Sequence, residues 1–276
     1  MLLNIKPFIF TALGIALLFI SCSDDSPLLE SEPEPELPCR VNFYTSNWYM
    51  GDRSGNPAQT PFGYDAQGRV ILAPVGNNQI SFEYYDDSVI LKYAGEAPNT
   101  VTDYYSLNEN GLITHLRRVW MAPWETEAKD YLVLDFVYDE KGYLSRIKEE
   151  DREVLFSYED GNLVNIHDGL NGNDEDIKLT YYANTDFSNL PIHSTTPIYH
   201  ISSLHRTPTP IFNPVGMAVL TSGGYFGKFP KNRIKTIGTY ELSYEADDKN
   251  NISKLKEVNS AESIDSMVYH IEHTCF

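Results

Sequence analysis

Basic residues, cysteine and long apolar runs are scarce in this chain, and each scarcity excludes or disfavours a class of protein. Lysine and arginine number 21 against 39 aspartate and glutamate residues, which gives a formal charge of −18. Such a field repels phosphate backbones, so we expect no nucleic-acid partner. The apolar run over residues 8–20 is too short for a comfortable membrane span.

The signatures of common active sites are also missing. The sequence contains no Gly-x-Ser-x-Gly nucleophile motif, no His-Glu-x-x-His metal motif and no glycine-rich phosphate loop. We therefore assign no catalytic residue, metal site or cofactor, and we expect that the protein is not an enzyme.

Residues 1–21 are typical of a signal peptide. Lys6 precedes the apolar run, which ends in Ser21 directly before Cys22. This arrangement resembles a bacterial lipoprotein signal, in which cleavage leaves an N-terminal cysteine that is lipidated. Cys22 is the predicted lipidation site. An ordinary signal peptide with an incidental cysteine is the alternative, and a signal anchor is a further one.

Residues 22–38 are expected to form an acidic, proline-rich tether. Prolines lack the backbone donor and the glutamates repel one another, so the segment stays extended. Ser23, Asp24 and Asp25 resemble the export tag of surface lipoproteins in Bacteroidota, whereas the start of a solvated linker is the alternative. The expected location is the outer membrane, facing the cell exterior, with the lipid anchor holding the protein to the membrane.

Residues 39–276 are expected to form a single domain. Once Cys22 is lipidated, the remaining cysteines are Cys39 and Cys275, one at each end of this domain. In an oxidising compartment an even pair favours a disulfide, and two free buried thiols are the alternative. A bridge would bring the first and last strands together.

A turn motif recurs through the domain. Residues 138–144 read Tyr-Asp-Glu-Lys-Gly-Tyr-Leu, in which the Asp can bond to the backbone and Gly142 provides a positive φ. Related turns centre on Gly68, Gly111, Gly161 and Asn250. Apolar residues stand two and five positions after most of these turn residues: Ile113 and Leu116, Leu144 and Ile147, Leu163 and Ile166, Ile252 and Leu255. A spacing of three cannot lie on one face of a regular strand, so we expect a β-bulge; packing of the first residue at the turn is the alternative.

The strands between the turns alternate. Ile80, Phe82 and Tyr84 oppose Ser81 and Glu83, and later strands follow the same pattern. Strands with one apolar face and one solvent-exposed face predict an antiparallel sheet that packs on one side only. The charged residues at the outer positions exclude a membrane-spanning pore. The predicted fold class is all-β: a single curled antiparallel β-meander, an open and barrel-like sheet of repeated hairpins.

Prolines interrupt this pattern between residues 191 and 214, which predicts a long irregular excursion. One short helix is expected over residues 214–225. Asn213 suits the N-cap, Pro214 suits the first turn, and Gly223 and Gly224 supply the stop.

The ordered set of motifs resembles a known family. It comprises the Tyr-Asp-x-x-Gly hairpins, the segment Gly-Lys-x-x-Lys-Asn at residues 227–232 and the closing hairpin at residues 240–255. Together these resemble the Bacteroidota lipoprotein family of unknown function with a porin-like fold (domain-of-unknown-function family 4595), over residues 64–258. The hairpin motif alone is also similar to the tyrosine-aspartate repeats of secreted shell proteins. The resemblance implies a curled antiparallel sheet on a secreted lipoprotein, and no catalytic residues.

Aromatic side chains are the candidate ligand-binding residues. Trp120 and Trp124 flank a predicted loop, and Trp48 marks a second position. Neutral sugars stack on such rings, although tryptophans are more often core residues. We expect a non-enzymatic binding or structural module with a glycan or protein ligand; a carbohydrate-processing accessory protein is the alternative. The oxygen-rich residues 168–176 match no calcium-loop spacing and are expected to form a solvated hairpin tip.

Overall fold

The computed structural model describes residues 40–50, 53–54, 58–75, 78–94, 100–121, 127–170, 175–183, 214–228, 230–248, 251–260 and 265–274. The chain divides into two units, Met1–Leu37 and Pro38–Phe276. All of the described residues belong to the second unit, and the fold below is that of this unit.

Eighteen strands and one helix make up the described part. The elements are β1 (Arg40–Met50), β2 (Arg53–Ser54), β3 (Ala58–Pro61), β4 (Gly63–Tyr64), β5 (Val70–Val75), β6 (Asn78–Tyr84), β7 (Ser88–Ala94), β8 (Thr100–Leu107), β9 (Ile113–Met121), β10 (Lys129–Tyr138), β11 (Leu144–Glu149), β12 (Arg152–Glu159), β13 (Asn162–Asp168), β14 (Glu175–Tyr181), α1 (Pro214–Ser222), β15 (Ile234–Ile237), β16 (Tyr240–Ala246), β17 (Ile252–Asn259) and β18 (Asp265–Thr274).

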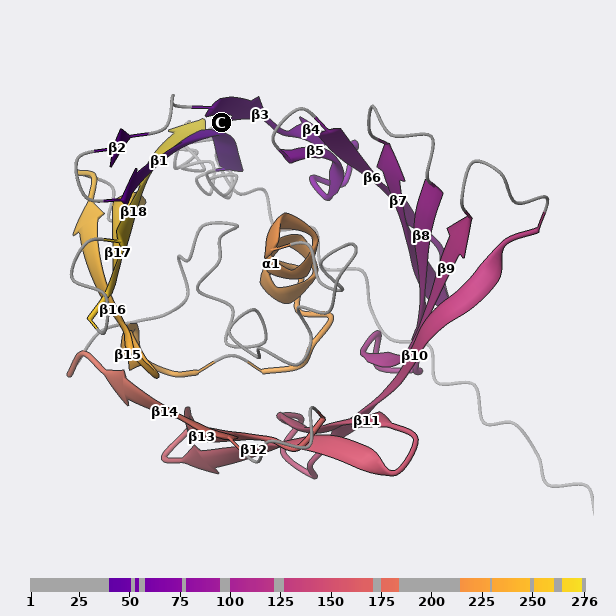
Figure 1. Cartoon of the computed structure of the whole chain (residues 1–276). Helices are drawn as coiled ribbons and strands as arrows, with labels where there is room; N and C mark the ends of the chain where they lie inside the picture. Colours follow the sequence, from indigo (N-terminus) through magenta and orange to yellow (C-terminus); the bar gives the residue numbers. More distant parts are fainter. Residues whose placement is uncertain are drawn as a thin grey trace, which may run out of the picture. The chain divides into compact units, whose positions relative to one another are not determined.

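The sheet is an antiparallel meander that curls until its first strand meets its last (Figure 1). Each strand from β4 to β17 pairs with the next strand along the chain, β18 pairs with β1, and β1 pairs with β2 and β3. The sheet remains open, because within the described residues no ladder joins β3 to β4 or β5. These findings confirm the predicted open, curled antiparallel sheet with one short helix.

The repeated turns use local chemistry. Gly68, Gly111, Gly142 and Gly161 all have positive φ, between 74° and 84°. In the turn after β10, the Asp139 carboxylate accepts bonds from the backbone N–H groups of Lys141 and Tyr143, at 2.9 and 2.8 Å. The equivalent side chains in three other turns accept from the N–H four positions on; they are Asp65, Asn108 and Asp247.

A β-bulge follows each of these turns, as predicted. The strand register shifts where Tyr138 pairs with Leu144 and Val137 with Arg146, so Ser145 is the extra residue. Its hydroxyl donates to the Val137 carbonyl at 3.0 Å. Equivalent shifts accompany the other turns. The bulge changes the phase of the strand, and all eight apolar residues two and five positions past the turns are therefore buried, none more than 3% exposed.

The core lies inside the curl and includes α1 (Figure 1). All of residues 215–220 are buried, so the helix is enclosed rather than packed by one face. A Cβ on Gly216 would stand 3.1 Å from the Leu91 side chain, which shows how closely α1 approaches β7. The helix ends at Ser222, earlier than the expected residue 225, because Gly224 takes a φ of +78° and the backbone turns there.

Residues 225–228 and 230–233 form a strap that crosses the ends of the hairpins. The Tyr225 carbonyl accepts from Ile113 N–H, and Lys228 N–H donates to the Gly142 carbonyl. Lys231 N–H donates to the Gly161 carbonyl. The strap thus contacts the hairpins β8–β9, β10–β11 and β12–β13 in order, at intervals of three residues.

Successive hairpins are offset by two strand spacings, or about 9.6 Å. The segment with the Gly-Lys-x-x-Lys-Asn motif makes one backbone contact with the β10–β11 turn and one with the β12–β13 turn. Asn232 adds a fourth contact, since its N–H donates to the Asn162 side chain at 2.9 Å.

The pairing of β1 with β18 bears on the predicted disulfide. Arg40 lies opposite Thr274 in this ladder, and each is the chain neighbour of one cysteine. Cys39 and Cys275 themselves lie outside the described residues. The first and last strands are therefore neighbours, and the bridge between them stays a prediction.

Mass spectrometry of the natively exported protein after thiol alkylation without reduction tests the bridge. We expect Cys39 and Cys275 to remain unlabelled and to accept label only after reduction. In the chain-entropy model, a disulfide that closes so long a loop stabilises the domain by up to about 5 kcal/mol. Reduction should therefore also lower the melting temperature. Two labelled thiols before reduction would rule the bridge out.

Candidate functional site

Because consecutive strands are antiparallel, the connections between them lie alternately at the two ends of the sheet. The turns at Gly68, Gly111, Gly142 and Gly161 lie at one end, which we call the turn end, and the strap crosses it. The connections that follow β5, β7, β9, β11, β13 and β17 lie at the opposite end, the loop end. Loops carried by a rigid scaffold are where binding residues concentrate, so the loop end is the candidate site.

Two of the three candidate tryptophans, Trp120 and Trp48, lie at the loop end. Trp120 is the penultimate residue of β9, where it pairs with Val101 and Lys129 and is partly buried. Trp48 lies near the end of β1, opposite Met267 of β18. Trp124 lies outside the described residues, so the structure assigns it no position relative to Trp120.

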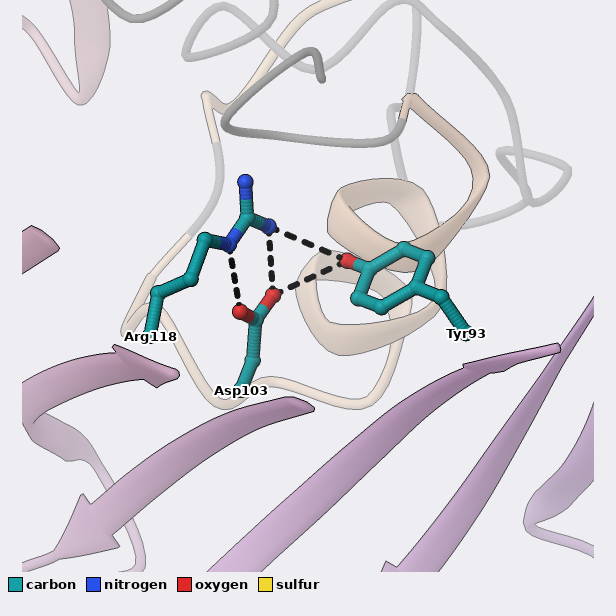
Figure 2. A network of polar contacts seen from close by, with 3 residues as sticks. All are labelled: Tyr93, Asp103 and Arg118. Carbon is teal, nitrogen blue, oxygen red and sulfur yellow. Dashed lines mark hydrogen bonds and ion pairs between the residues drawn. The ribbon is translucent and has the colours of Figure 1, made fainter. Parts of the chain in front are cut away.

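A buried polar network lies on the inner face just below Trp120. It joins Tyr93 of β7, Asp103 of β8 and Arg118 of β9, and we call it the ion-pair brace (Figure 2). The Arg118 Nε and Nη2 atoms each donate to one Asp103 oxygen at 2.6 Å. The Tyr93 hydroxyl donates to Asp103 Oδ2 at 2.9 Å and accepts from Arg118 Nη2 at 3.4 Å. Asp103 and Arg118 are 0% and 1% exposed.

Burial and charge fix the protonation states of the brace. Burial, together with the nearby Asp103 carboxylate, raises the pKa of Tyr93 well above its usual value, so its hydroxyl stays protonated. Burial alone would lower the pKa of Arg118, but the charge and hydrogen bonds of Asp103 outweigh it and raise that pKa. The brace is therefore a guanidinium–carboxylate pair with a neutral phenol.

The chemistry of the brace is structural. A bidentate pair of this kind fixes two neighbouring strands in register, because both hydrogen bonds need one geometry. A Cβ on Gly216 would stand 3.6 Å from the Tyr93 hydroxyl, so α1 lies against the brace. The brace thus holds the loop-end halves of β7, β8 and β9, and with them the position of Trp120.

Sequence reasoning did not identify the brace, although a signal was present. Asp103 stands between Val101 and Tyr105 at core positions of a period-two strand, and Arg118 follows Leu116 in the same way. Opposite charges at inward positions of adjacent strands indicate a buried pair. The signal requires the pairing of β8 with β9, which local patterns do not provide.

Histidine, cysteine and carboxylate side chains in the described part of the chain form no group of three or more able to hold a metal ion. Residues 171–174 of the oxygen-rich turn lie outside it. Nor does any helix within the described ranges have the length and apolar content required to cross a membrane.

Comparison with protein families identifies the fold. The profile of the family described as "Domain of unknown function (DUF4595) with porin-like fold" matches residues 62–259. The chain belongs to this family. The match confirms the resemblance inferred for residues 64–258, and it spans the hairpins, α1, the strap and the brace. Among curated proteins, no match is found.

Solved structures resemble this family member in fold. A porin-like protein from Bacteroides uniformis has 17% sequence identity and a TM-score of 0.58, with 88% of this chain and 99% of that chain covered. A porin-like protein from Bacteroides vulgatus has 15% identity and a TM-score of 0.46, covering 86% and 99% of the two chains. At 17% identity the similarity to the Bacteroides uniformis protein concerns the fold alone. Nothing is concluded from the similarity to the Bacteroides vulgatus protein.

Proposed function

We propose that this chain is a surface-exposed outer-membrane lipoprotein whose curled sheet acts as a non-enzymatic binding or structural module. The observation that carries the proposal is the rigid support beneath the loop end. The ion-pair brace and α1 fill the interior there with paired charges and apolar side chains, so the strand ends that carry the loops are held in place. The ligand is a glycan or a protein that contacts these loops.

Anchoring rests on Cys22, which lies outside the described residues. Cys22→Ser should move the protein from the membrane fraction to the soluble fraction, because no lipid acceptor remains after the signal peptide is processed. Fractionation of cells that express either form, with sequencing of the N-terminus, measures this. A wild-type protein that keeps its intact N-terminus in the membrane fraction would show a signal anchor instead.

The second candidate function is a carbohydrate-binding or carbohydrate-processing accessory protein that uses the loop between Trp120 and Trp124. The partly buried Trp120, fixed at the loop end beside the brace, favours it. We expect neutral polysaccharides embedded in the gel to retard the full chain in affinity electrophoresis. Trp124→Ala should abolish this retention. Trp120→Ala should weaken it as well, because stacked rings supply much of the contact area.

The outcome separates the two candidates. Retention that both alanine variants leave unchanged would place the glycan site elsewhere. An absence of retention for every polysaccharide, combined with capture of a protein partner, would favour the module without a carbohydrate role. Circular dichroism of each variant establishes that the sheet has formed before binding is compared.

A further inference from the structure

The bulged strands have gaps in their hydrogen-bond ladders at the turn end. Six strands contain a bulge directly after their first inward-facing residue: β5, β9, β11, β13, β15 and β17. These inward-facing residues are all buried: Val70, Ile113, Leu144, Leu163, Ile234 and Ile252. On the edge that faces the following strand, the ladder begins only two residues later, as at Leu72, His115 and Asn165. The backbone carbonyls of the six buried residues, which we call the gap carbonyls, therefore lie beyond the ladders of that edge.

Tyrosine hydroxyls of the following strands bond to most of the gap carbonyls. Four of them donate at distances between 2.6 and 2.9 Å: Tyr84 to Val70, Tyr138 to Ile113, Tyr181 to Leu163 and Tyr244 to Ile234. Each tyrosine stands one residue beyond the position that the ladder, if continued, would place opposite the gap carbonyl. We call this the latch position. A buried carbonyl without a donor costs free energy, so these hydroxyls replace hydrogen bonds that the bulges remove from the ladder.

A histidine occupies the latch position of β18. The ladder of β17 and β18 pairs Lys254 with His270. If continued, it would place Glu272 opposite Ile252, so His273 stands one residue beyond. The His273 Nε2 atom lies 2.9 Å from the Ile252 carbonyl. A carbonyl can only accept, so Nε2 carries the hydrogen and donates it, as the tyrosine hydroxyls do.

Tyr158 of β12 is a natural exception. It occupies the latch position relative to Leu144, because the ladder of β11 and β12 pairs Arg146 with Leu155. Its hydroxyl nevertheless donates to no acceptor in the part of the chain that the structure describes. Its ring packs against Tyr143, with the centroids 4.7 Å apart. Tyr158 therefore has the ring and the position of a latch residue without the hydrogen bond.

We propose that the latch side chains couple successive hairpins at the turn end. The bulge that brings a hairpin's buried residues into phase also frees a carbonyl, and the next strand supplies the donor. Tyr138 therefore serves the preceding hairpin, while its neighbour Asp139 closes the turn of its own hairpin. The latch at His273 couples β17 to β18, the strand that pairs with β1. The proposal is independent of any ligand at the loop end.

Phenylalanine variants of the full chain test the proposal, because they remove only the hydroxyl. Tyr84→Phe, Tyr138→Phe, Tyr181→Phe and Tyr244→Phe should each raise the equilibrium constant for unfolding about tenfold, since a buried carbonyl loses its donor. Tyr158→Phe is the matched control and should leave the constant unchanged. Urea unfolding followed by circular dichroism gives the constants. Four variants that behave like Tyr158→Phe would overturn the proposal.

Hydrogen exchange followed by mass spectrometry locates the effect within the sheet. Tyr181→Phe should speed exchange in the turn-end halves of β13 and β14 and leave the loop-end halves unchanged. The coupling would be refuted by exchange that rises equally over all strands, because the loss would then be global.

Two variants of His273 test the last latch. His273→Phe should raise the unfolding constant as the tyrosine variants do. His273→Tyr supplies a hydroxyl donor and also removes the Nδ1 atom, which is buried without a partner among the described residues. It should therefore keep the wild-type constant or lower it. Equal losses for the two variants would overturn the proposal for β18.

Discussion

Arg118→Met is expected to lower the free energy of unfolding by about 3–5 kcal/mol, the range for removing one partner of a buried ion pair. The substitution keeps an unbranched side chain, about two atoms shorter, but leaves the Asp103 carboxylate, 0% exposed, without its counter-ion. Tyr93 alone cannot neutralise that charge. Urea denaturation followed by circular dichroism measures the loss.

Two further variants show whether the lost stability comes from the unpaired charge. The double variant Arg118→Met/Asp103→Leu removes both charges and should regain most of the loss, because apolar replacement of a buried pair is often neutral or stabilising. Arg146→Met removes an arginine from the exposed pair with Glu153 and should cost less than about 1 kcal/mol. If the double variant were as unstable as Arg118→Met, the loss would come from packing and not from the isolated carboxylate.

Gly227→Ala should destabilise the domain by about 3 kcal/mol and release the strap. Gly227 has a φ of +82°, and a Cβ there would stand 2.5 Å from the Gly142 carbonyl oxygen and 3.1 Å from the Tyr138 ring. The Gly142 carbonyl belongs to the backbone and cannot move aside to relieve this contact. The strap therefore has to move away from the β10–β11 turn. Thermal unfolding measures the stability, and trypsin cleavage after Lys228 and Lys231 reports the release.

Gly111→Ala is the control for Gly227→Ala. Gly111 has a similar φ of +74°, but nothing lies within 4 Å of its added Cβ. It should cost only the backbone strain, about 1–2 kcal/mol, and leave the strap resistant to trypsin. Equal losses for the two variants would mean that the close approach of the strap contributes nothing to stability.

The hairpins could be predicted from the sequence because their determinants are local. An aspartate such as Asp139 accepts from the backbone within its own turn, and Gly142 provides the positive φ three residues later. The bulge then follows from Leu144 and Ile147, which both reach the core only if the strand changes phase. Each of these effects acts within about ten residues, and the chain repeats them often enough to fix the fold class.

The brace, the strap and the enclosure of α1 could not be predicted in this way. Asp103 and Arg118 meet only when β8 and β9 pair, and the strap finds Gly142 and Gly161 across a long excursion of the chain. The short helix itself was predicted, but not that the curl would surround it. All three depend on contacts between segments distant in sequence, and local periodicity contains no information about such contacts.

The ladder between β1 and β18 has a consequence for how the protein folds. In the proposed export from the N-terminus, β1 would emerge first and β18 last, so one edge of β1 would stay unpaired until the end of the domain had emerged. Contacts of such large sequence separation form slowly, whereas the hairpins from β4 to β17 can form as they emerge. The expected folding intermediate is a half-curled sheet with one open edge, to which other chains could pair.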